Sequence, residues 1–246
     1  MSAIPGRGKI LASSLVFVVA SIVLLFELIC LKAAGTGYFD SPTPDFLNGM
    51  GITQGLLWFL GFAILIDWLV FDTFPVWGAS RRALLGATLK LIASVCFTIQ
   101  PASAAFGYLQ DAKGPCFSPA GVPWSNFLGI LFFHTGNCID AIGSLPMLDV
   151  GHLCSMGNLP VYGILTYCAA TWVLVIGDGF AFVANSPPFG AGKPMSPYVA
   201  PANVVGSIGL LLGSLIYTWW AACFGRGGKR HGGPMMVEPL VNVMPQ

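Results

Sequence analysis

Five ionisable residues stand inside long apolar stretches of this 246-residue chain: Glu27, Asp67, Lys90, Asp140 and Asp178. If those stretches cross a membrane, a charge at the bilayer centre costs about 2.5–3.5 kcal/mol on insertion scales. Such groups usually face the interior of a helix bundle and find partners there. They can form ion pairs, relay protons or line the path of an ion or substrate.

Asp67, Lys90 and Asp140 form a first group. With the threading argued below, they lie in the membrane half nearer the termini, roughly 7 to 14 Å from its boundary at about 1.5 Å per helical residue. We expect an intramembrane charge network in which Lys90 pairs with Asp140 or Asp67, because a lysine without a partner in hydrocarbon is deprotonated or extends toward water. Extension toward water and a proton or ion pathway are the alternatives.

Glu27 and Asp178 form an outer acidic pair in the other half of the membrane, without a basic residue in the spans at their depth. Two carboxylates at one depth can bind a cation, and Asn185 and Asn203 could add oxygen ligands. Scattered polar groups near the membrane interface are the simpler interpretation, which we favour.

His134 is the deepest of the three histidines, and one buried histidine can ligate a haem iron or a chlorin magnesium. We favour a structural histidine whose ring is hydrogen-bonded by Thr135 or Asn137, and we expect no cofactor besides surrounding lipid. The seven cysteines show no CxxC or zinc spacing, so no metal site is expected. Topology suggests one disulfide hypothesis, between Cys30 and Cys116.

Six apolar stretches must position these residues. Hydrophobic residues make up 55% of the chain and charged residues 9%, too little charge for the surface of a soluble domain of this length. Each stretch exceeds the ~20 residues needed to cross ~30 Å of hydrocarbon. We therefore predict an all-α, polytopic bundle of six transmembrane helices. The stretches are Ile10–Leu31, Phe46–Phe71, Ala83–Leu109, Trp124–Leu148, Pro160–Asn185 and Tyr198–Phe224.

Basic residues fix the expected threading. Of the eleven Lys and Arg residues, two precede the first span, two lie between the second and third spans, and three follow the sixth span. The positive-inside rule then places both termini on the cytoplasmic, matrix or stromal side. Residues 1–224 form the membrane domain, and residues 225–246 form a polar tail rich in Gly and Pro. These seven basic residues are Arg7, Lys9, Arg81, Arg82, Arg226, Lys229 and Arg230.

A short frame of small residues, G-[NS]-x5-G-S-L, occurs in both the fourth and the sixth span. A seven-residue step returns to nearly the same helix face, so each span carries a stripe on which another backbone can approach closely. We favour helix packing over chance or a pore lining, and a duplicated two-helix unit is a further suggestion. The residues concerned are Gly136, Gly143 and Ser144 in one span, and Gly206, Gly213 and Ser214 in the other.

With these residues the fourth and sixth spans resemble the YrhK-like membrane domain family, whose two-helix units carry Gly-Ser steps beside apolar runs. The resemblance covers about a fifth of the chain and implies a membrane helical fold. It implies no activity, because that family has no well-established one.

The motifs of common enzymes are missing, including GxSxG, HExxH, Walker A and GxGxxG in context, so we expect a protein that is not an enzyme. A net charge of +1 gives no excess of basic residues that would bind the phosphates of a nucleic acid. The favoured function is a structural or accessory subunit that packs against other membrane subunits or itself. The alternative is a small transporter or channel that uses the membrane carboxylates. A hydrated cavity would favour the transporter or channel. Small-residue faces covered by another chain would favour the accessory subunit.

Overall fold

The computed structural model describes residues 6–34, 43–73, 81–105, 124–185 and 199–223, and that part of the chain is almost entirely helical. Six helices are long and apolar enough to cross a membrane, so the predicted all-α six-span bundle is confirmed. The predicted tail, 225–246, lies outside the described residues. The spans are α1 (Arg7–Ala34), α2 (Pro44–Asp67) with its π-helical continuation η1 (Trp68–Thr73), α4 (Arg81–Ala105), α5 (Trp124–Ser144), α6 (Leu159–Asn185) and α7 (Val199–Cys223).

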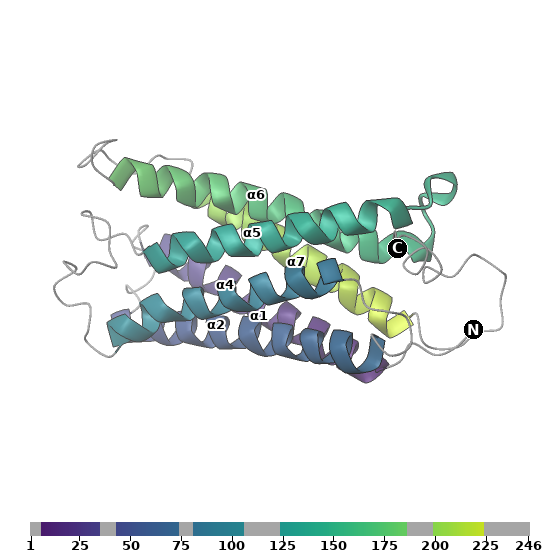
Figure 1. Ribbon diagram of the computed structural model, residues 1–246. Coiled ribbons are helices and arrows are strands. Elements are labelled where there is room, and N and C mark those ends of the chain that lie inside the picture. The colour runs from purple at the N-terminus through teal and green to yellow at the C-terminus, as the bar shows by residue number, and fades with distance from the viewer. Residues whose placement is uncertain (1–5, 35–42, 74–80, 106–123, 186–198, 224–246) are drawn as a thin grey trace.

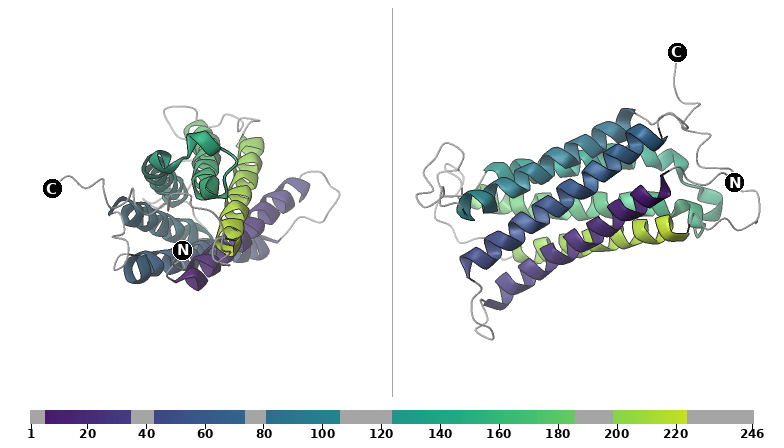
Figure 2. Two further views of the ribbon diagram at one scale, coloured as in Figure 1. Left: turned by 90° about the vertical axis from the view of Figure 1, so that its right-hand side faces the viewer. Right: turned by 90° about the horizontal axis from the view of Figure 1, so that it is seen from below.

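The six spans form a closed ring (Figures 1 and 2). Each packs against the next along the chain, and α7 returns to pack against α1. Arg7 closes this last contact: its Nε donates to the carbonyl oxygen of Ala221 at 3.1 Å and its Nη2 to that of Ala222 at 2.5 Å. We call the end with Arg7 and Cys223 the terminal end, and the end with Asp45 the distal end.

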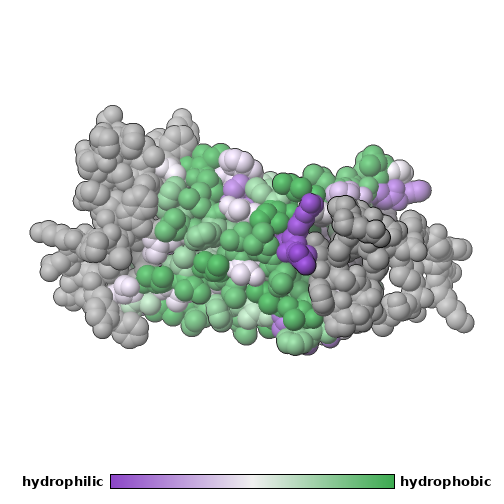
Figure 3. Space-filling model, viewed as in Figure 1, coloured by the Kyte–Doolittle hydropathy of each residue, from purple (hydrophilic) through white to green (hydrophobic). Residues whose placement is uncertain are grey.

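The outside of the ring is apolar. Figure 3 shows hydrophobic side chains over most of the described middle of one face. On α1 the exposed residues Leu15, Val19, Ile22, Phe26 and Ile29 follow one another at helical spacing. Large exposed apolar surface between polar ends is typical of contact with lipid, and the six apolar helices indicate a multi-pass membrane protein.

Aromatic rings fill the middle of the interior. Phe17 contacts Phe62 with ring centroids 4.6 Å apart, and Trp58 contacts Phe133 edge-to-face at 5.3 Å. Phe97 joins the cluster through Phe133 at 6.1 Å. These five residues, which we call the aromatic barrier, come from α1, α2, α4 and α5, so they join four of the six helices across the ring axis.

Serines lie where helices approach closely, which suits packing between membrane helices. The Ser13 hydroxyl on α1 donates to the carbonyl oxygen of Gly61 on α2 at 2.8 Å. Each of these serines is 1% exposed or less: Ser13, Ser21, Ser94, Ser207 and Ser214.

The glycines of the repeated frame face helices of the same chain. A Cβ built on Gly136 would lie 2.7 Å from the carbonyl oxygen of Gly86 on α4. Cβ atoms on Gly206 and Gly213 would lie 2.5 Å from Leu174 and 2.9 Å from Tyr167, both on α6.

Gly143 differs from the prediction, since a Cβ there would meet no described atom within 4 Å. The same seven-residue step in α7 keeps both of its glycines against α6, so the repeated frame alone does not determine which glycines contact another helix. Beside it, Ser144 Oγ donates to the carbonyl oxygen of Ala141 on its own helix at 3.1 Å.

Candidate functional site

A cavity of about 340 Å³ lies on the ring axis in the distal half of the bundle, and residues of all six helices line it. Its size falls within the range typical of small-molecule sites. Apolar side chains make up much of its wall, including Leu24, Leu174 and Leu210. The polar lining residues are Glu27, Asn48, Gln54, Asn126, Asn203 and Ser207.

Glu27 is the only ionisable residue among the described residues that line this cavity. A Cβ built on Gly51 would lie 3.9 Å from Glu27 Oε1 and 2.9 Å from Pro101 Cβ. The carboxylate of α1 therefore lies against the glycine of α2, beside the proline within α4. The structure gives it no hydrogen bond or ion pair to any described residue.

Three rings of the aromatic barrier also line the cavity and form its floor: Trp58, Phe97 and Phe133. Trp58 is 2% exposed, so its indole is fixed between its neighbours. Beneath the floor Phe62 continues the barrier toward the terminal end, with its centroid 5.9 Å from that of Trp58. The cavity is thus closed on its inner side by packed rings.

Below the barrier, Lys90 of α4 forms an ion pair with Asp140 of α5. The two side chains are 8% and 19% exposed. Lys90 Nζ also lies 5.5 Å from the ring centroid of Phe62, within the range of a cation–π contact. Of the two partners expected for Lys90, the structure brings Asp140 to it.

Asp67 is not part of that pair. Its carboxylate lies 2.6 Å from Lys9 Nζ, which also contacts Asp72 at 2.7 Å. Asp67 ends α2 at the level of the first turn of α1. At that level the carboxylate pairs with Lys9 and not with Lys90. From the sequence, Lys9 was expected to flank the first span, whereas α1 already begins at Arg7.

His134 has different partners from those expected. Its Nδ1 lies 2.9 Å from Thr171 Oγ1 on α6, and its Nε2 lies 3.2 Å from Cys138 Sγ, one turn along α5. Thr135 instead donates to the carbonyl oxygen of Leu131, because consecutive helical residues point in different directions. Both ring nitrogens thus contact described side chains, and an axial ligand role for Nε2 would require Cys138 to move.

The remaining outer residues are described only in part. The side chain of Asp178 lies outside the described residues, so its expected pairing with Glu27 stays a prediction. The same holds for the disulfide, because Cys116 also lies outside them. Cys30 forms no disulfide with a described cysteine.

Hydroxyl groups join α1, α6 and α7 on the terminal side of the cavity. Tyr167 Oη lies 2.5 Å from Ser214 Oγ, which lies 3.2 Å from Ser21 Oγ. Each serine also has a carbonyl oxygen of its own helix within hydrogen-bond distance, that of Leu210 for Ser214 and that of Phe17 for Ser21. Because each hydroxyl has one proton, the serine that donates to the other serine does not also donate to its own helix. All three side chains are buried, so these bonds hold the ring closed at its α7–α1 contact.

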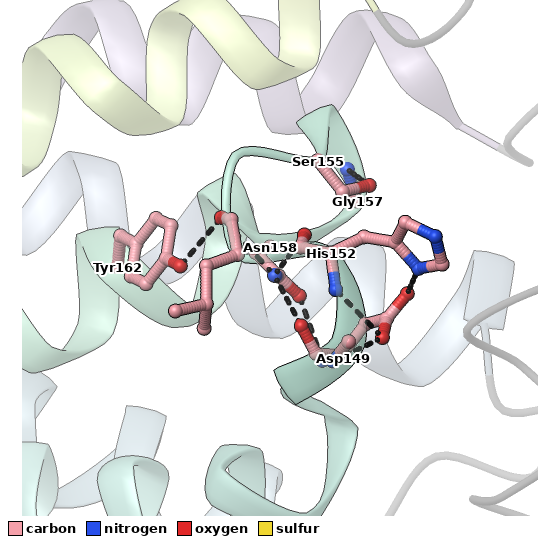
Figure 4. A network of polar contacts seen from close by, with 8 residues as sticks. Asp149, His152, Ser155, Gly157, Asn158 and Tyr162 are labelled. Carbon is pink, nitrogen blue, oxygen red and sulfur yellow. Dashed lines mark hydrogen bonds and ion pairs between the residues drawn. The ribbon is translucent and has the colours of Figure 1, made fainter.

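The α5–α6 loop at the terminal end is an ordered structure (Figure 4). Asn158 is 1% exposed, and its Nδ2 donates to the carbonyl oxygens of Asp149, His152 and Leu153. Its Oδ1 accepts from the amide of Asp149 at 2.9 Å. The Asp149 carboxylate and the His152 ring face each other at 3.0 Å in solvent.

Of the cavity amides, Asn203 was expected from the sequence as a group beside Glu27, whereas Asn48, Gln54 and Asn126 were not. Asn48, Gly51, Gln54 and Trp58 follow a spacing of three and four residues, and all four line the cavity. This places a polar stripe on one face of α2, in a span that is otherwise apolar. Such a stripe is the signal that could have located the cavity.

Comparison with known proteins adds no assignment to this geometry. No protein-family model, curated protein or solved structure matches the chain.

Proposed function

We propose that this protein is a small membrane transporter that carries a solute through the axis of its six-helix ring. The observation that supports this most is the cavity of about 340 Å³, to which every span contributes. Polar groups inside a membrane are costly and commonly mark substrate paths. Carriers bind their substrates near the middle of the membrane, between helices that can move relative to one another.

The contacts below the cavity suit a gate. The aromatic barrier packs beneath the cavity, and the Lys90–Asp140 pair joins α4 to α5 on its terminal side. Nearer the terminal end, Lys9 joins α1 to α2 and η1. Ion pairs between helices can exchange partners or water, so they are suited to contacts that form in one state and break in another.

The accessory-subunit hypothesis has less support. It rested on stripes of small residues that needed another helix to cover them. Gly136 faces α4, and Gly206 and Gly213 face α6, so helices of the same chain cover these positions. No observation on the described residues favours a partner chain over lipid at the remaining apolar surface.

The basic residues support one orientation of this carrier. Arg7, Lys9, Arg81 and Arg82 all lie at the terminal end, which we place on the cytoplasmic, matrix or stromal side by the positive-inside rule. The cavity then lies in the opposite half of the membrane.

Accessibility from the two sides tests the proposal. Gln54→Cys places a thiol in the cavity, and a membrane-impermeant methanethiosulfonate reagent is added to one side of vesicles of known orientation. Labelling is measured above that of the parent chain with its native cysteines. We expect labelling from the distal side, and from the terminal side when Lys9→Gln removes the contacts to Asp67 and Asp72.

Thr53→Cys is the matched control, because this neighbouring position is exposed on the outside of α2 and should face lipid. It should stay unlabelled from either side. Labelling of Gln54→Cys from both sides supports the carrier. Labelling from the distal side alone, with Lys9 or without it, contradicts transport and leaves a structural or receptor role.

A further inference from the structure

We propose that the cavity binds a small organic cation, with Glu27 as its counter-charge and Phe97 of the aromatic floor as its second contact. The inference rests on the proposed function, since it names the substrate class of the same cavity. It also predicts binding whether or not the bound molecule is then transported.

The charge of the lining residues indicates the sign of the ligand's charge. Glu27 has no ion pair or hydrogen bond with a described residue, and the described lining contains no Lys, Arg or His. A half-buried carboxylate without a partner among the described residues is stabilised by a compensating charge or by hydrogen-bond donors. A cationic ligand supplies both, whereas an anionic ligand would add a second uncompensated charge to the cavity.

The aromatic floor favours an organic cation over a metal ion. Trp58, Phe97 and Phe133 line the cavity together with Glu27, and Phe97 is the partly exposed ring among them, since Trp58 and Phe133 are each 2% exposed. An acid beside an accessible aromatic ring is the chemistry that binds ammonium groups, because the ring quadrupole attracts a weakly hydrated cation. A calcium ion instead takes six to eight oxygen ligands, whereas much of this lining is apolar.

The amides account for the rest of the polar lining. Asn48, Gln54 and Asn126 can each donate and accept hydrogen bonds toward a hydroxyl or amine of the ligand. A volume of about 340 Å³ exceeds that of a bare ion and suits a molecule of several heavy atoms.

The test compares choline with its uncharged carbon isostere, 3,3-dimethylbutan-1-ol, on the purified full-length protein by isothermal titration calorimetry. Benzyltrimethylammonium serves as a larger cation. We expect at least one of the cations to bind, and the isostere to bind at least about tenfold more weakly than choline where choline binds. Glu27→Gln should weaken cation binding at least about tenfold and leave any binding of the isostere unchanged.

Asp45→Asn is the matched control, because it removes a carboxylate at the same end of the bundle that is exposed and does not line the cavity. It should bind the cations like the parent chain. If Glu27→Gln does not fold, Phe97→Leu keeps the carboxylate and should still weaken cation binding several-fold.

Three results overturn the inference: neither cation binds, the isostere binds as tightly as choline, or calcium or sodium alone binds in a Glu27-dependent manner. Its failure is distinguishable from failure of the proposed function. Glu27-dependent cation binding in a protein whose Gln54→Cys thiol is never labelled from the terminal side would support the ligand and contradict transport. Labelling from both sides without cation binding would support transport and contradict the organic cation as the ligand.

Discussion

Lys90 on α4 and Asp140 on α5 form an ion pair beneath the aromatic barrier, and their side chains are only 8% and 19% exposed. The positions are 50 residues apart in the chain, yet antiparallel packing of the third and fourth spans brings them to one depth. The Asp140 carboxylate also lies against Gly86, where a side chain would occupy its space. The pair is thus part of the α4–α5 contact.

Removing one partner of this pair should destabilise the protein strongly, because the other charge stays buried without compensation. We expect Lys90→Met or Asp140→Asn to cost about 3–5 kcal/mol of unfolding free energy. The double variant Lys90→Met/Asp140→Asn should cost clearly less than the sum of the single changes. Denaturant unfolding of the detergent-purified protein measures the cycle, and additive losses would contradict coupling between the two charges.

Sequence predicted the spans well and the pairing of charges only in part. Long apolar runs fix where helices cross a membrane, so α6, expected from Pro160, begins at Leu159. Depth along the membrane made Asp140 and Asp67 equal candidates for Lys90. Choosing between them requires the order of helices around the ring and the first turn of α1, where Lys9 contacts Asp67. Neither is encoded in hydropathy.

The full lining of the cavity could not be predicted from hydropathy for a related reason. Its lining comes from all six spans, so it depends on the rotation of every helix about its own axis. A polar residue such as Gln54 can face a partner, lipid headgroups or a cavity with the same local sequence. The ring closure between α7 and α1, which gives the bundle an axis, appears only in three dimensions.

The two glycines of the fourth-span frame should respond oppositely to alanine. Gly136→Ala places a Cβ 2.7 Å from the carbonyl oxygen of Gly86. This oxygen belongs to the helix backbone of α4, which can shift only slightly. We expect a loss of about 1–3 kcal/mol from overpacking. Gly143→Ala meets open space and should be neutral or stabilise the helix by about 0.5–1 kcal/mol. Thermal unfolding of both variants gives the comparison, and equal losses would show that the contact at Gly136 is not specific.

Asn158 should control the order of the α5–α6 loop. Asn158→Ala removes the donor to three carbonyl oxygens, which cannot all find new partners while the loop keeps its shape. We expect faster amide hydrogen exchange through residues 149–157, followed by mass spectrometry. His152→Ala is the control, because its ring is solvent-exposed and its ion pair among the described residues is with Asp149. A loop that exchanges equally fast in both variants would contradict a special role for Asn158.

The hydroxyl contacts between α1, α6 and α7 should be coupled to one another. Tyr167→Phe removes one buried hydroxyl from Ser214, and Ser214→Ala removes the group that lies between Tyr167 and Ser21. Hydrogen bonds between membrane helices average about 0.6 kcal/mol in double-mutant cycles, so each single change should cost about 0.5–2 kcal/mol. The double variant should cost less than the sum, since Tyr167 has already lost its partner once Ser214 is alanine. Unfolding measurements on the four proteins decide this, and strict additivity would mean that the Tyr167 hydroxyl contributes nothing through Ser214 to closure of the ring.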